Sequence, residues 1–184
     1  MVIIKNNYYL YIENLKDINF DNFKINKKIN IIYRNPKNYE IDEIIKFRKN
    51  CIKKKFKFYI ANNAKIAIKS KASGLYISAF NKKIYHLNIP KIGAAHNLKE
   101  INQKIKQNCK TIIVSRLFIT NYKNKISFLG VIKFNLLKIK FNINILPLGG
   151  INSKNLLSLN MIKCNGFSIL SLIKKKPTIS SRLF

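Results

Sequence analysis

The sequence predicts an α/β protein, a single (β/α)8 TIM-type barrel of somewhat reduced length. Short apolar runs recur along the chain and alternate with longer mixed segments, a pattern typical of buried parallel strands joined by crossover helices. Eight such runs can be counted, and eight parallel strands close a barrel. Because 184 residues is short for this fold, a flavodoxin-like open sheet is the alternative.

The expected strands are short segments rich in isoleucine, tyrosine and phenylalanine, residue types that favour strands. They lie at residues 8–12, 29–33, 57–61, 74–78, 91–95, 111–115, 143–148 and 166–173. The mixed segments between them predict helices at 39–55, 64–72, 98–108, 127–141 and 153–162. The segment 13–28 is short for a full helix, and the segment 81–90 lacks a good helical pattern. Residues 1–173 are expected to form one domain, followed by a basic tail at 174–184.

The charge balance is strongly basic, with 36 Lys and Arg against 7 Asp and Glu and a net charge of +29. One interpretation is a polyanionic partner such as nucleic acid. The lysines are spread along the whole chain, however, and only four arginines occur. Nucleic-acid-binding proteins usually concentrate charge and interleave it with arginine and aromatic residues. We therefore favour a compositional origin and keep nucleic-acid binding as an alternative function.

The acidic residues restrict the chemistry, because six of the seven lie within residues 13–43 and only Glu100 follows. Such a chain can hardly build a paired-carboxylate hydrolase site or an all-protein magnesium cage. Three widely spaced cysteines argue against a disulfide framework. Neither a secretory signal nor a membrane-length apolar run is visible. We expect a cytoplasmic protein without membrane contact, and a homo-oligomer is compatible with the sequence.

Two adjacent glycines, Gly149 and Gly150, end the seventh expected strand in a chain with only six glycines. Glycine lets the backbone approach a ligand and point N–H groups at an anion. The ends of strands seven and eight often form a phosphate site in such barrels, and Ser171 would add a hydroxyl there. The alternative interpretation is a plain strand-to-helix turn with Ser153 as the helix N-cap.

Five segments together resemble one family. They read YIANN at 59–63 leading to GLYI at 74–77, IGAAHNLKE at 92–100, LFITNYK at 117–123, ILPLGGINSKN at 145–155 and KCNGFSILSLI at 163–173. In order and spacing these segments are similar to motifs of the thiamine-phosphate synthases and the related thiazole tautomerases, which are (β/α)8 barrels. The resemblance covers residues 29–173, and the family's substrates are phosphorylated heterocycles.

The resemblance implies roles for individual residues. The phosphate of a thiazole phosphate would be held by Gly149, Gly150, Ser168 and Ser171. Thr120 and Lys123 would lie over the active site, where the lysine could neutralise a leaving diphosphate. Arg34 matches an arginine of the family, and His96 matches a histidine that precedes the helix after strand five.

The sequence departs from the family where the synthases hold magnesium, because their two aspartates fall on Asn62 and Asn81. A neutral amide attracts a magnesium diphosphate less than a carboxylate does. Any magnesium would therefore be brought mainly by the diphosphate substrate.

The resemblance implies a transferase of thiamine biosynthesis, which joins hydroxymethylpyrimidine diphosphate to thiazole phosphate with loss of diphosphate. The alternatives are a relative that only binds a phosphorylated thiazole, and a metal-free tautomerase-like enzyme with His96 as its acid or base.

Overall fold

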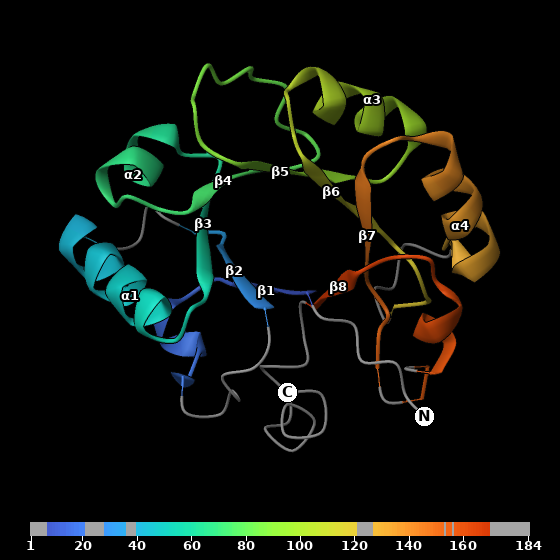
Figure 1. Ribbon diagram of the computed structural model, residues 1–184, viewed down its shortest axis with the longest axis horizontal. Helices are drawn as coiled ribbons and strands as arrows, with labels where there is room; N and C mark the ends of the chain where they lie inside the picture. The colour runs from blue at the N-terminus through green and yellow to red at the C-terminus, as the bar shows by residue number, and fades with distance from the viewer. Residues whose placement is uncertain are drawn as a thin grey trace.

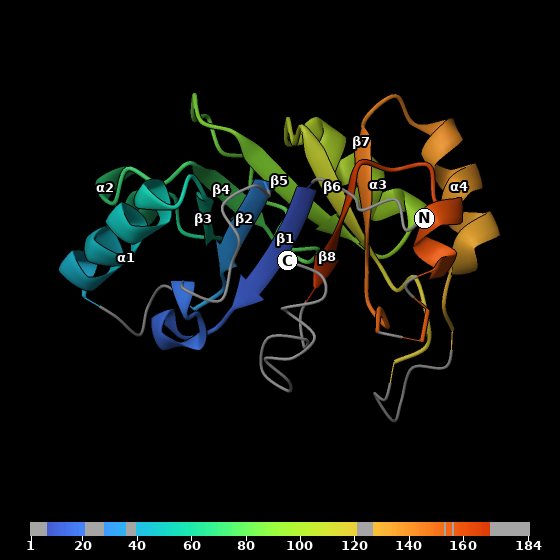
Figure 2. The same ribbon diagram turned by 60° about the horizontal axis from the view of Figure 1, so that its bottom comes forward.

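The computed structural model describes residues 7–20, 28–35, 40–120, 127–152, 154–155 and 157–169. Eight parallel strands form a closed barrel in sequence order, seen as a ring in Figure 1 and from a tilted direction in Figure 2. The strands are β1 (Asn7–Ile12), β2 (Lys28–Tyr33), β3 (Lys57–Ala61), β4 (Gly74–Ile77), β5 (Lys91–Ala95), β6 (Thr111–Ser115), β7 (Asn144–Leu148) and β8 (Gly166–Ile169). Because β8 pairs with β1, the barrel prediction is confirmed and the open sheet is excluded.

Four α-helices of the described chain lie outside the ring of strands (Figure 1). They are α1 (Ile41–Lys53), α2 (Ala64–Lys69), α3 (Leu98–Lys106) and α4 (Gly130–Lys140). Asparagine caps two of them, since the side chain of Asn63 accepts from Ile66 N and that of Asn97 accepts from Glu100 N. Such caps satisfy amides that the first helical turn leaves without partners.

Successive strand residues face opposite sides of the barrel wall. Outward residues build the core beneath the helices, as where the Phe58 ring packs against Phe47 of α1 with 5.3 Å between ring centroids. Inward residues meet across the barrel, as where the hydroxyl of Tyr11 on β1 donates to that of Tyr76 on β4 over 3.3 Å. The interior therefore carries phenols between its aliphatic side chains.

The fifth expected helix differs from the prediction. Residues 153–162 were expected to be α-helical, but the described chain forms only a short 3-10 helix there, η3 (Leu157–Met161). Asparagine side chains upstream explain this, because the Asn152 amide N–H donates to Asn155 Oδ1 and the Lys154 amide N–H to Asn152 Oδ1. Side chains that bond the nearby backbone in this way compete with helix formation.

The two segments in which no full helix was expected contain no α-helix among their described residues. Residues 81–90 have no helical turn, and the described part of 13–28 includes the 3-10 turn η1 (Leu15–Asp17). All three cysteines are free and buried. Within the described ranges, no helix has the length and apolar character needed to cross a membrane. The expected tail, 174–184, lies outside the described residues.

Candidate functional site

The carboxyl ends of all eight strands meet at one rim of the barrel because the strands are parallel. At this rim the glycine pair after β7 adopts left-handed backbone angles, with φ of 97° at Gly149 and 71° at Gly150. A Cβ atom on Gly150 would lie 2.5 Å from the carbonyl oxygens of Phe118 and Ile119. Glycine is thus required at position 150 by both conformation and space.

The turn leaves backbone donors available. The amides of Gly150 and Ile151 donate to no residue in the described part of the chain. The side chain of Asn155 braces the turn, because its Nδ2 donates to Gly150 O over 2.7 Å and its Oδ1 accepts from the amide of Asn152 over 2.9 Å. A braced turn with unused N–H groups is a suitable place for an anion.

The eighth strand lies beside this turn, since Leu148 pairs with Ser168. Ser168 is fully buried, and its hydroxyl has no hydrogen-bond partner among the described residues. Contact between Ser168 and a phosphate would require the ligand to reach into the barrel. Ser171 and Ser153 lie outside the described residues.

Arg116 is a site residue that the sequence analysis missed. It follows β6 directly, and its Cγ lies 3.2 Å from the position of a Cβ on Gly149. Its guanidinium donates to Thr120 Oγ1 over 2.8 Å and to Ser127 O over 2.9 Å. A usable signal was present, because Arg116 is one of only four arginines and directly follows an expected strand. The structure thus brings Thr120 together with the glycine turn through Arg116, while Lys123 lies outside the described residues.

Arg34 follows β2, where its amide donates to Ile12 O over 2.9 Å. Its guanidinium lies 5.8 Å from the centroid of the Tyr11 ring, within the range of a cation–π contact. Burial raises the pKa of Tyr11 and Tyr76, and the Arg34 charge opposes this only in part. The two phenols are therefore protonated at neutral pH, and Arg34 places a positive charge above them.

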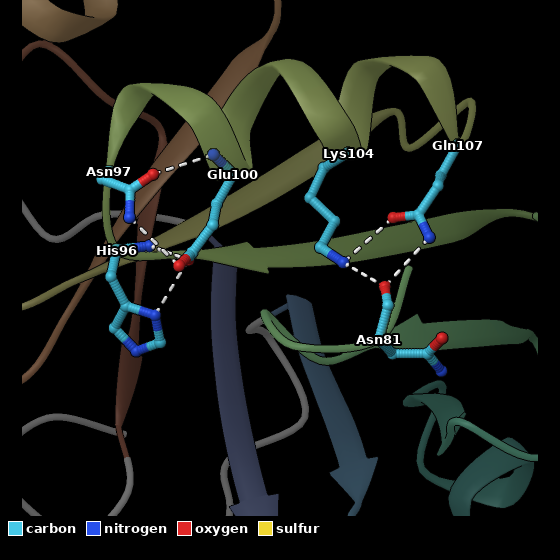
Figure 3. Close-up of polar contacts among 6 residues, drawn as sticks. All are labelled: Asn81, His96, Asn97, Glu100, Lys104 and Gln107. Carbon is cyan, nitrogen blue, oxygen red and sulfur yellow. Dashed lines mark hydrogen bonds and ion pairs between the residues drawn. The ribbon is translucent and has the colours of Figure 1, made fainter. Parts of the chain in front are cut away.

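His96, after β5, is paired with Glu100 of α3 (Figure 3). The carboxylate accepts from the His96 amide over 2.7 Å and lies 3.0 Å from the ring Nδ1. Burial would raise the pKa of Glu100, but the His96 contacts and the Asn97 amide outweigh it and lower the pKa. The imidazole side chain is 51% exposed, so a carboxylate orients a ring whose Nε2 remains accessible for proton transfer.

Asn62 and Asn81, the positions matched to the synthase aspartates, are hydrogen-bonded to each other. Asn62 Oδ1 accepts from Asn81 Nδ2 over 2.9 Å, and also from the amide and the hydroxyl of Ser78 over 3.0 and 3.1 Å. Asn81 Nδ2 donates in addition to the hydroxyl of Tyr85 over 3.0 Å, and Asn81 Oδ1 accepts from the amide of Lys83.

This arrangement does not fit a divalent cation. Three donors already occupy Asn62 Oδ1, and Asn81 presents its NH2 group to Asn62. Magnesium binds in proteins through carboxylates and keeps several waters. No cluster of three or more His, Cys, Asp or Glu that could hold a metal occurs among the residues described.

A buried lysine supports the same segment from α3 (Figure 3). Lys104 is fully buried, and its Nζ donates to Asn81 O over 2.8 Å and to Gln107 Oε1 over 2.9 Å. Gln107 Nε2 donates to Asn81 O as well, over 3.0 Å. The Lys104 stem passes over Gly93, where a Cβ would lie 2.7 Å from Lys104 Cγ. Burial lowers the pKa of Lys104.

Solved structures resemble this barrel closely in fold. Thiamine phosphate pyrophosphorylase from Pyrococcus furiosus matches with a TM-score of 0.71 over 97% of this chain and 93% of the other, at 14% identity. The corresponding protein of Bacteroides thetaiotaomicron matches with 0.60 over 95% and 91%, at 12% identity. A KDPG aldolase from Legionella pneumophila also reaches 0.60 over 98% and 91%, at 14% identity. At such identities the likeness concerns the fold alone.

Comparisons of sequence identify the family of this chain more narrowly than the comparisons of fold. Thiamine-phosphate synthase of Prochlorococcus marinus subsp. pastoris is 32% identical over 139 residues, which are 72% of this chain. The chain spans only 39% of that relative's length. A family model described as thiamine monophosphate synthase matches residues 30–173. This range contains every expected site residue, most of β2 and the six strands that follow it, so the chain belongs to the thiamine monophosphate synthase family.

Proposed function

We propose that this protein is a transferase that joins hydroxymethylpyrimidine diphosphate to thiazole phosphate and releases diphosphate. One observation carries the proposal. The turn after β7 keeps the Gly150 and Ile151 amides free of described partners and lies against Arg116. Main-chain amides are typical phosphate ligands, and the Arg116 guanidinium, held by Thr120 after the neighbouring strand β6, would add a charged donor. Membership of the family supplies the class of substrate.

In the proposed reaction, the bond between the pyrimidine methylene carbon and the diphosphate oxygen breaks, and its electron pair leaves with diphosphate. The thiazole nitrogen donates its lone pair to the same carbon, and the new C–N bond gives a thiazolium product. The attacking nitrogen carries no proton, so the protein's part is mainly electrostatic. Arg34 would stabilise the charge of the departing diphosphate, and Lys123 has the same expected role.

Thr120 would act through Arg116, because its hydroxyl already accepts a bond from the guanidinium. The asparagine pair would position the chain after β3 and β4 and would not hold a metal. A magnesium ion would arrive with the diphosphate, and no step of the proposal depends on it.

The test is to incubate the purified protein with both substrates, once with EDTA and once with magnesium, and to detect thiamine phosphate by mass spectrometry. We expect product in both conditions. Faster turnover with magnesium would mean that the cation enters with the diphosphate. Product in neither condition would refute the transferase proposal. Calorimetry with thiazole phosphate alone then asks whether the phosphate site binds without catalysis.

A second candidate function is acid–base isomerisation of a phosphorylated thiazole, and the His96–Glu100 pair favours it. Glu100 holds Nδ1, so Nε2 could take a proton from one ring position and return it at another. The proton count balances without a co-reactant. This reaction also needs no metal, which agrees with the closed asparagine pair.

The second candidate is tested by following interconversion of the two thiazole tautomers in D2O by NMR. His96→Asn should lower the rate by about a hundredfold, and Glu100→Gln by less, because the imidazole is kept but loses its orientation. The Lys99→Gln variant, an exposed neighbour on α3, is the control. Wild-type protein that leaves the tautomers unchanged would exclude this function.

A further inference from the structure

A pocket of about 450 Å³ lies at the end of the barrel opposite the rim. The residues around it are Asn7, Tyr9, Lys28, Ile29, Asn30, Lys55, Lys57, Tyr59, Pro90, Lys91, Ile92, Lys110 and Thr111. These residues begin or directly precede β1, β2, β3, β5 and β6. Because parallel strands start at a common edge, the pocket occupies the amino-terminal mouth of the barrel, which we call the base pocket.

The charged side chains that line the base pocket are all positive. Its described lining includes five lysines and neither aspartate nor glutamate. Strand register places two of these lysines on the inward face. Asn7 lies on the same face of β1 as the inward Tyr11, Lys28 pairs with Asn7, and Lys57 pairs with Asn30 on the same face of β2 as Lys28. Lys55 reaches the pocket from the turn between α1 and β3, where it has a left-handed φ of 58°. Clustered ammonium groups without counter-ions repel one another, and an anion between them would remove that repulsion.

Phenols lie beside the lysines. Burial raises the pKa of Tyr9, and the nearby Thr111 side chain opposes this rise in part. Tyr59 is only 5% exposed, and its hydroxyl makes no hydrogen bond to any described residue. Burial raises the pKa of Tyr59, so this hydroxyl stays protonated and can donate. The hydroxyl therefore adds a neutral hydrogen-bond donor to the cationic lining, from which a bound anion could accept.

The position of the Tyr59 ring depends on a glycine in the neighbouring strand. A Cβ on Gly74, its partner on β4, would lie 2.7 Å from the Tyr59 ring, so glycine at 74 is what allows the ring to lie there. The base of a (β/α)8 barrel is normally closed by packed aliphatic side chains. Here phenols, lysines and an open volume stand in their place.

We propose that the base pocket binds a small phosphorylated anion of the diphosphate class, at a site separate from the rim. Two linked phosphates present more acceptor oxygens and more charge than one monophosphate, so they can bridge lysines from several strands. A pocket of about 450 Å³ has room for a small molecule. General attraction of the +29 surface for polyanions is the alternative that the experiment must exclude.

Inorganic pyrophosphate is the probe, and tyrosine signals are the readout. Protein with 13C-labelled tyrosine rings is titrated at ~0.15 M salt, where long-range attraction is screened, and signals are assigned by single Tyr→Phe variants. Tyr9 and Tyr59 report on the base pocket, whereas Tyr11 and Tyr76 lie near Arg34 and report on the rim. We expect saturable shifts of the Tyr9 and Tyr59 signals at millimolar pyrophosphate or below.

Two double variants with the same change in net charge separate a site from general attraction. Lys28→Glu with Lys57→Glu removes inward lysines, and Lys46→Glu with Lys49→Glu alters exposed lysines of α1 outside the pocket. The first pair should weaken the Tyr59 response by at least about tenfold, and the second should change it less than about twofold. Tyr59→Phe, which keeps the ring, should weaken the Tyr9 response by about threefold.

Three outcomes would overturn the proposal: no saturable shift of the Tyr9 and Tyr59 signals at millimolar pyrophosphate, equal weakening by both charge-reversal pairs, or an unchanged response in the Lys28/Lys57 variant. Circular dichroism and the unperturbed Tyr11 and Tyr76 signals check that each variant is folded. Because the readout does not involve turnover, the result is independent of the proposed transferase activity.

Discussion

The side-chain amide of Asn81 donates a hydrogen bond to Asn62 Oδ1 over 2.9 Å. Two carboxylates at such a distance would repel each other, and either a shared proton or a cation between them would relieve the repulsion. Two amides instead pair as donor and acceptor, and Ser78 supplies the remaining donors to Asn62. The pair is thus stable without metal.

If aspartates replace Asn62 and Asn81, we expect the stability of the protein to depend on a bound metal ion. The double variant Asn62→Asp with Asn81→Asp loses the amide donor and places two negative charges together. We expect its free energy of unfolding to fall by about 1–3 kcal/mol without metal. Millimolar magnesium should recover about 1–3 kcal/mol, measured by thermal unfolding with and without EDTA.

Asn50→Asp, on the exposed side of α1, is the control and should not respond to magnesium. A double variant equally stable with and without the cation would show that the backbone cannot present two carboxylates to one ion.

The two glycines with similar backbone angles, Gly150 and Gly130, provide a matched test of the close approach at the rim. Their φ values are 71° and 68°. A Cβ on Gly150 would meet backbone oxygen at 2.5 Å, whereas one on Gly130 has its nearest neighbour at 3.9 Å. Gly130→Ala should cost about 1 kcal/mol from conformation alone, and Gly150→Ala about 3 kcal/mol or more. Urea unfolding measures both, and equal losses would contradict the close approach.

Arg116 should control phosphate affinity at the rim. The stem of Arg116 lies against Gly149, and its guanidinium is held by Thr120. Arg116→Gln removes this charge and should weaken binding of thiazole phosphate about 10- to 100-fold. Calorimetry measures the change. Arg48→Gln, on α1, removes the same charge elsewhere and should leave affinity within about twofold. If both variants lose affinity equally, the phosphate does not bind beside Arg116.

Glu100 should give the protein a stability component that depends on acid pH. The folded-state pKa of Glu100 is lowered below its usual value of 4.5. The stabilisation is therefore present above the unfolded pKa and is lost as pH falls through the folded one. Between about pH 6 and pH 3, melting temperature should fall more for the wild type than for Glu100→Gln.

The matched control for this pH profile is Glu43→Gln on α1, whose carboxylate bonds to no described residue. It should keep the wild-type pH profile. A Glu100→Gln profile parallel to the wild type would show that the His96 contacts do not stabilise the ionised carboxylate.

Local patterns in the sequence were sufficient to predict the barrel fold. Apolar runs located all eight strands to within one or two residues at the described ends, because the apolar residues of each buried strand are adjacent in the sequence. The helix expected at 153–162 failed for a local reason as well. Asn152 and Asn155 bond the nearby backbone, and the apolar pattern gave that competition too little weight.

Only the tertiary structure distinguished residues of one type from one another. Lys104 is fully buried against Asn81 O, whereas most lysines of this chain are exposed. Nothing in its immediate sequence marks it, because its burial depends on Gly93 in a neighbouring strand. The contact of Arg116 with the glycine turn and the lysine-lined base pocket arise in the same way, from strands that are distant in sequence.

By itself, the sequence determined the order of strands and helices, the glycine turn after β7 and membership of the family, since each of these depends on neighbouring residues or on motif spacing. The tertiary structure decided that Asn62 bonds Asn81, that Glu100 holds His96 and that lysines gather at the base. The physical reason is that hydrogen bonds and charge interactions act over a few ångströms in space. Barrel closure sets those distances for strands far apart in the chain.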